Sequence, residues 1–149
     1  MPTLIENKKA HLNFEILERF DAGVELTGSE VKSLKSKRGS LIGAFVGARG
    51  GEVFLLGADI PPYQPGNAAD DYDPHRARRL LLTKTEIDRL SGFESKKGLT
   101  IIPISMYTKG RTIKLSIGVA RGKKTHDKRE SIKKREAKLN IERELKRDR

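Results

Sequence analysis

Apolar and polar residues alternate along two neighbouring segments of this chain, and the alternation stops after Val119. A period of two places alternate side chains on opposite faces of a β-strand. Segment 112–119 has this period, with one apolar face made of Ile113, Leu115, Ile117 and Val119. Segment 99–107 repeats it, and we expect one shared face from Ile102, Ile104 and Met106. The two strands are joined by Thr108-Lys109-Gly110-Arg111, a hairpin signal.

Earlier segments predict more strands of the same kind. The first is expected over 12–26, with a bulge or tight bend at Asp21-Ala22-Gly23. Two others, 41–48 and 52–60, flank the hairpin signal Arg49-Gly50-Gly51. A short apolar run at Leu80–Leu82 follows a basic stretch.

Two short helices are predicted from capping-box spacings. Thr27 and Glu30 open the first helix, and we expect Gly39 to supply its left-handed C-terminal cap. Thr83 and Glu86 open the second, which should stop near Gly92. Five or six antiparallel strands with two or three short helices indicate a mostly β fold. We expect a small closed antiparallel β-barrel of oligonucleotide-binding type over residues 1–122.

Charge points to a polyanionic partner. The chain has 149 residues, with 31 Lys and Arg against 20 Asp and Glu, a net charge of +11. Segment 121–149 holds 13 of these cations and 6 of these acids. This basic tail, 123–149, has few apolar residues, so we predict disorder until it binds the ribosome or another anionic partner. No apolar run could span a bilayer and no cysteine is present, so we expect a cytoplasmic monomer with no membrane partner.

Signals for catalysis, metals or cofactors are weak. His11, His75 and His126 stand in no metal-ligand spacing. The acidic group Asp70, Asp71 and Asp73 lacks the following Glu of a calcium loop. We therefore expect a protein that is not an enzyme and that uses no cofactor.

Basic clusters carry the positive signal. Any one of them could be a solvated face, but together they favour contact with RNA phosphates. They are Asn7–His11; Lys32, Lys35, Lys37 and Arg38; Arg76, Arg78 and Arg79; Arg121, Lys123 and Lys124; and the tail. Exposed aromatic residues are scarce, which favours structured RNA over single strands and leaves three stacking candidates, Tyr63, Tyr72 and His126.

Glu30 has two compatible interpretations. It can cap the first helix, or its carboxylate can accept a hydrogen bond from the edge of a base.

Three blocks of the chain resemble the SsrA-binding protein (SmpB) family. They are Gly28–Ser33, Arg78–Leu82 and Gly118–Arg129, and Asn7–His11 matches as well. The resemblance implies a closed barrel that binds the tRNA-like domain of transfer-messenger RNA and enters stalled ribosomes in trans-translation. It further implies contact with the small subunit, and with alanyl-tRNA synthetase and elongation factor Tu indirectly through the RNA.

The same resemblance implies roles for individual residues. The expected RNA-binding residues are Lys8, His11, Glu30, Lys32, Ser33, Lys35, Arg121, Lys123 and Lys124. The tail residues His126, Asp127, Lys128 and Arg129 would sense the empty mRNA channel, and 132–147 would form a helix there. The sequence departs from the family pattern at 37–41, which lacks an expected Asn, and at 105–107. A ribosomal or ribosome-assembly protein stays open as the alternative, since it would share the barrel, the charge and the tail.

Overall fold

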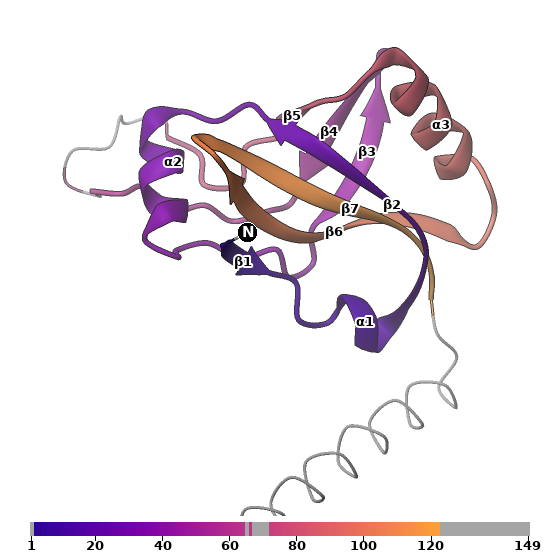
Figure 1. The fold of residues 1–149 in the computed structure, drawn as a ribbon, viewed down its shortest axis with the longest axis horizontal. Helices are drawn as coiled ribbons and strands as arrows, with labels where there is room; N and C mark the ends of the chain where they lie inside the picture. Colours follow the sequence, from indigo (N-terminus) through magenta and orange to yellow (C-terminus); the bar gives the residue numbers. More distant parts are fainter. Residues whose placement is uncertain (1, 65, 67–71, 123–149) are drawn as a thin grey trace, which may run out of the picture.

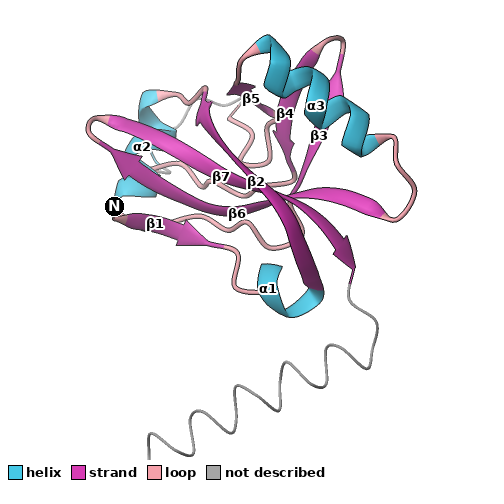
Figure 2. Ribbon diagram, turned by 45° about the vertical axis from the view of Figure 1, so that its right-hand side comes forward, coloured by secondary structure: helices cyan, strands magenta, loops and turns pink. Residues whose placement is uncertain are grey.

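The computed structural model describes residues 2–64, 66 and 72–122, which form one curved antiparallel sheet with helices at its margins (Figures 1 and 2). Within these residues the strand order is β1-β6-β7-β2-β5-β4-β3. The strands are β1 Thr3–Glu6, β2 Phe14–Val24, β3 Phe45–Arg49, β4 Glu52–Leu56, β5 Arg78–Leu81, β6 Leu99–Lys109 and β7 Thr112–Gly122. The helices are α1 Ala10–Asn13, α2 Gly28–Lys35 and α3 Lys84–Glu94. No helix in the described part is long and apolar enough to cross a membrane.

The sheet is open, which corrects the expectation of a closed barrel. Its edges are β1 and β3, and in the described ranges no ladder joins them. A side chain of α3 occupies the outer edge of β3 instead. The Ala48 N–H donates to Glu94 Oε2 at 2.7 Å, and Arg49 contacts Glu94 Oε1 at 3.3 Å. The backbone donor that a neighbouring strand would need is therefore already satisfied.

Both predicted hairpins are confirmed. Arg49 pairs with Glu52, and the turn between them consists of Gly50 and Gly51 with φ of 59° and 79°. Two consecutive positive φ values are those of a type I′ turn, which glycine adopts without steric cost. Lys109 pairs with Thr112 across a second two-residue turn. The strands of the resulting β6–β7 hairpin are 11 residues long each.

The long strands β2 and β6 each contain a bulge where the sequence pattern did not place one. In β2 the register shifts between Ile16 and Glu18, so the bend expected at Asp21–Gly23 is wrong. Gly23 is regularly paired, and its lack of a side chain admits Leu81, whose Cβ would lie 3.2 Å from a Cβ added there. In β6 the register shifts between Pro103 and Ser105.

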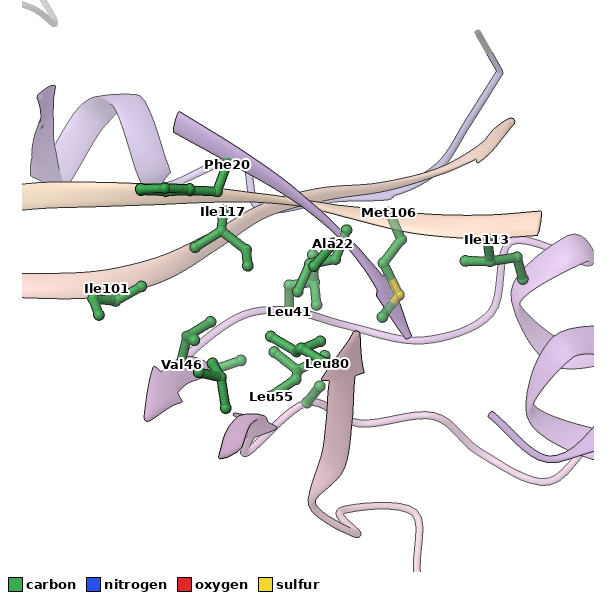
Figure 3. Close-up of a cluster of buried hydrophobic side chains, with 14 of the residues drawn as sticks. Phe20, Ala22, Leu41, Val46, Leu55, Leu80, Ile101, Met106, Ile113 and Ile117 are labelled. Atoms are coloured by element: carbon green, nitrogen blue, oxygen red, sulfur yellow. The ribbon is translucent and has the colours of Figure 1, made fainter. Parts of the chain in front are cut away.

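The β6 bulge also overturns the face predicted for that strand. The extra residue reverses the alternation, so Ile102 and Met106 pack in different clusters. Met106 belongs to the main core with Leu55 and Ile117, shown in Figure 3. Ile102 joins Ala10 and Ala120 in a small second cluster on the other face of the sheet, against which Phe14 and Ile16 pack.

A lysine, not a glycine, ends helix α2. Lys37 has φ of 59°, its N–H donates to the Leu34 carbonyl at 2.8 Å, and the Arg38 N–H donates to the Ser33 carbonyl at 3.0 Å. This pair of bonds is the Schellman motif, so the cap predicted at Gly39 is wrong by two residues. Gly39 also has positive φ, 122°, where an added Cβ would approach the Asp59 carbonyl at 3.1 Å.

Element boundaries shift at several other places. Strand β1 and helix α1 were not predicted, and β2 begins at Phe14 rather than residue 12. Strand β3 begins at Phe45 rather than 41, because a turn in which the Ala44 N–H donates to the Leu41 carbonyl precedes it. Strand β4 ends at Leu56 rather than 60, and α3 continues past Gly92 to Glu94. The acidic loop at 67–71 and the tail lie outside the described residues.

Candidate nucleic-acid interface

The arginines before β5 are engaged within the protein. Arg78 is fully buried, with Nη2 at 2.6 Å from Glu30, and Arg76 lies 2.5 Å from the same carboxylate. Arg79 is more exposed and pairs with Glu52 at 3.0 Å. The sequence grouped these three arginines as one basic cluster, but each has a carboxylate partner. They are consequently less available for phosphate contact than cations that have no carboxylate partner.

Glu30 is the buried centre of this arrangement. It is 1% exposed, and both halves of the capping box predicted with Thr27 are present. One oxygen accepts from the Thr27 N–H at 2.8 Å and from Arg76, and the other accepts from Arg78 Nε at 2.8 Å. Burial by itself would raise the pKa of Glu30, but the hydrogen bonds from Thr27, Arg78 and Arg76 outweigh burial and lower it. The geometry supports the capping interpretation and leaves no carboxylate edge open to a base.

Arg78 ties distant segments together around that carboxylate. Its guanidinium donates to the Ala58 and Pro74 carbonyls, each at 2.9 Å. Nearby, the Tyr72 hydroxyl donates to the Ile60 carbonyl at 2.7 Å, and burial followed by the Glu30 charge raises the pKa of Tyr72. Tyr72, predicted as a stacking candidate, is half-buried and engaged within the protein.

The solvent-facing side of α2 and the turn after it carry cations that are not neutralised. Lys32, Lys35, Lys37 and Arg38 reach solvent, and in the described part of the chain none forms an ion pair with a carboxylate. We call these four residues the α2 basic face. Ser33, predicted as an RNA contact, is instead fully buried, and its hydroxyl donates to the Pro61 carbonyl at 2.5 Å.

A second basic group forms where the sheet brings two distant segments together. The start of β2 pairs with the end of β7, with Phe14 opposite Gly122 and Glu15 opposite Arg121. Arg121 therefore lies beside the strand that directly follows α1, and Lys8 and His11, before and within α1, are exposed. We call Lys8, His11 and Arg121 the α1 basic group. Figures 1 and 2 show α1 and α2 at different ends of the sheet, so the predicted RNA-binding residues fall into two groups.

The remaining predicted site residues are Lys123, Lys124, His126, Asp127, Lys128 and Arg129, and all lie outside the described residues. Their chain follows directly from Gly122, the last residue of β7. In the sequence, the tail therefore follows directly after Arg121 and Gly122, and Arg121 belongs to the α1 basic group.

Sequence reasoning predicted no cleft, but the described residues form clefts, among them the following two. One, of about 370 Å³, lies among β2, β5 and α3 and is bordered by Asp21, Arg79, Leu81 and Lys114. The other, of about 280 Å³, lies beside α1, and Ile42 and Phe45 on its wall are exposed. Leu81 is 49% exposed although it belongs to an apolar run that the sequence gives no reason to place on the surface. Each cleft is lined by segments far apart in the sequence, so no local signal predicts it.

The histidines and acidic residues of the described ranges do not gather into a metal site. No group of His, Cys, Asp or Glu within them could hold a metal ion. The Tyr107 hydroxyl donates to Asp21 at 2.8 Å, and burial together with that bond raises the pKa of Tyr107 to about 12. A phenol held this way is a poor proton donor or acceptor near neutral pH.

Comparison with known proteins adds independent findings. A family model described as "SmpB protein" matches residues 4–147. The SsrA-binding protein of Synechococcus sp. (strain JA-3-3Ab) is 46% identical over 144 residues, covering 97% of this chain and 94% of the relative. The SsrA-binding protein of Clostridium acetobutylicum is 45% identical over 147 residues, covering 99% and 94%.

A solved structure is similar as well. Its description is "tmRNA-SmpB: a journey to the center of the bacterial ribosome". The matching chain is 40% identical, with a TM-score of 0.72, and the match covers 89% of this chain and 95% of that one.

Proposed function

We propose, on the premise that this chain belongs to the SmpB family, that it binds the tRNA-like domain of transfer-messenger RNA and enables delivery of that RNA to stalled ribosomes. The relatives are named for SsrA binding, and the similar solved chain is described with tmRNA and the bacterial ribosome. The chain would act in the cytoplasm as a monomeric RNA-binding protein, not as an enzyme.

The observation that carries this proposal is the contrast between paired and unpaired cations. Arg76, Arg78 and Arg79 have carboxylate partners, whereas the α2 basic face has none in the described part. Phosphates bound there would replace water and counterions rather than compete with an internal ion pair. A folded RNA with several arms fits a protein that presents two separate basic groups better than a single strand does.

Two further parts of the proposal concern the ends of the molecule. We propose that Lys8, His11, Arg121, Lys123 and Lys124 extend the RNA-binding surface. The tail residues His126–Arg129 would sense the empty mRNA channel, from a starting point held by the pairing of β7 with β2. Alanyl-tRNA synthetase and elongation factor Tu would be reached through the bound RNA.

The test is recovery of the RNA from cells with full-length tagged protein, followed by sequencing. One small tRNA-like species should dominate. Enrichment of ribosomal RNA in every growth state, with no such species, would favour the ribosome-assembly alternative and overturn the proposal.

A matched pair of variants tests the surface. Lys32→Ala should lower affinity for the isolated tRNA-like domain and reduce the slope of log affinity against log salt by about 1. Lys84→Ala removes an exposed lysine at the start of α3, which Figure 1 shows away from α1 and α2, and should change neither quantity. Equal effects of the two variants would show that only net charge matters.

A further inference from the structure

The segment after β4 is fastened along helix α2 by three hydrogen bonds. The Ser33 hydroxyl donates to the Pro61 carbonyl at 2.5 Å, and the Tyr63 N–H donates to Ser29 Oγ at 3.2 Å. Arg38 Nη1 then donates to the Tyr63 carbonyl at 3.0 Å. The backbone of Tyr63 is thus held on both sides by side chains of α2 and of the turn that follows it. Because this backbone is already held in place, binding a ligand at Tyr63 need not order it.

Tyr63 is exposed, and two cations of the α2 basic face lie near its ring. The residue is 37% exposed, and both Lys32 Nζ and Arg38 Cζ lie 5.9 Å from the ring centroid. The other two tyrosines differ, because Tyr72 and Tyr107 are half-buried and donate their hydroxyls within the protein. Of the three tyrosines, Tyr63 is therefore the one that combines an exposed side chain with nearby positive charges.

We propose that Tyr63, Lys32 and Arg38 bind one unpaired nucleotide of a folded RNA, with the base stacked on the ring and its phosphate held by the cations. This inference rests on the proposed function, in that the ligand is RNA. Bases inside an RNA helix offer no free face, whereas loop and bulge bases can stack on aromatic side chains. The α2 basic face supplies the phosphate contacts that stacking alone lacks.

The chain contains no tryptophan, which makes a clean reporter possible. Tyr63→Trp in the full-length protein places one indole at the ring position. Its fluorescence should be quenched to saturation by a tRNA-like domain with unpaired loops and should stay unchanged with a fully paired duplex of equal length. Binding of both RNAs is followed independently by mobility shift.

Affinity variants add a second readout. Tyr63→Leu should weaken binding of the looped RNA about tenfold, as expected for one stacked base, and should leave duplex binding unchanged. Tyr63→Phe keeps the ring and should bind as the wild type does. Tyr72→Phe is the matched control at a half-buried tyrosine. A small-subunit ribosomal RNA fragment with unpaired bases forms a parallel arm, and quenching by one RNA alone identifies the source of the nucleotide.

The outcomes separate this inference from the function beneath it. If the wild type shifts neither looped RNA, the proposed function and this inference both fall. If looped RNA binds but leaves the indole fluorescence of the Tyr63→Trp variant unchanged, and Tyr63→Leu binds normally, only the stacking site is overturned. Quenching by the duplex to the same extent would also overturn it, because the signal would then report proximity and not an unpaired base.

Discussion

At the residue scale, the most consequential interaction is the buried pair between Glu30 and Arg78. The two side chains are 1% and 0% exposed, and they join α2 to β5 across 48 residues of sequence. A paired charge in such a place contributes little net stability, but removal of one partner leaves the other buried and uncompensated. The pair therefore favours the one arrangement of α2 and β5 in which both charges are paired, because any other arrangement would leave a buried charge without its partner.

Glu30→Gln should lower the free energy of unfolding by about 3–5 kcal/mol, because the Arg78 guanidinium keeps its charge and loses its counter-charge. Urea unfolding measures the loss. Arg76→Met is the matched control: Arg76 contacts the same carboxylate, but its side chain is 41% exposed. Its loss should be under about 1 kcal/mol. Equal losses would show that the buried pair has no special role.

The pH dependence follows from the lowered pKa of Glu30. A carboxylate with a folded pKa below its ordinary value of 4.5 contributes stability that is complete above that value. This contribution is lost as the pH falls through the folded pKa. The difference in unfolding free energy between the wild type and Glu30→Gln should therefore narrow in acid. A difference that stayed constant down to about pH 2 would contradict this linkage.

Lys37 occupies a left-handed conformation that glycine adopts more easily. Lys37→Gly should raise the free energy of unfolding by about 1 kcal/mol, since the steric cost at positive φ disappears. Lys35→Gly, within the same helix, should lower it by a similar amount. Thermal unfolding distinguishes the two. Destabilisation by both substitutions would mean that Lys37 carries no strain.

Local chemistry explains which residue assignments could be predicted. Thr27 and Glu30 stand three residues apart, so the capping box is visible in the sequence. The hydrogen-bond partners Glu30 and Ala58 of Arg78 lie far away in the sequence, so no local spacing predicts these contacts. The same holds for Ser33, whose burial depends on the later passage of Pro61 over α2.

At the element scale, α3 protects the edge of β3 by one carboxylate. Glu94→Ala should speed hydrogen exchange of the Ala48 amide, because that N–H loses its 2.7 Å acceptor. The loss of stability should be about 1 kcal/mol. Glu94→Gln retains an oxygen acceptor and should give intermediate protection. Unaltered exchange in Glu94→Ala would show that the amide is shielded by packing alone.

Hairpins were predictable and bulges were not. A two-residue turn such as Gly50-Gly51 needs positive φ values, and glycines in the sequence predict residues that can adopt them. The extra residue in β6 is Ile104, whose apolar side chain continues the alternation as written. The bulge is recognised only from the pairing of β6 with β7. The same pairing shows on which face of the sheet Ile102 lies.

At the scale of the whole molecule, the described residues have their own core and the tail begins at its margin. A chain ending at Gly122 should unfold at nearly the same temperature as the full chain. It should bind the isolated tRNA-like domain only modestly more weakly and should lose ribosome rescue. Circular dichroism, mobility shift and a rescue assay measure the three effects. Equal loss of binding and rescue would contradict two separable surfaces.

The sequence predicted a β fold, a basic tail and a family, but not the open sheet. Barrel closure is decided by the contact between the first and last strands of the order, which here are β1 and β3. Alternation within a strand says nothing of that contact. The sequence likewise predicted five basic clusters, and only the positions of the carboxylates showed that the cluster at Arg76–Arg79 is neutralised within the protein.

The occupied edge of β3 has a consequence for how the protein behaves at high concentration. Exposed strand edges are templates on which other copies can add, and long ones nucleate fibrils. Here one edge strand is only four residues long, and the other donates a backbone N–H to Glu94. Other copies of the protein therefore find little free strand edge to pair with, although the sheet is open.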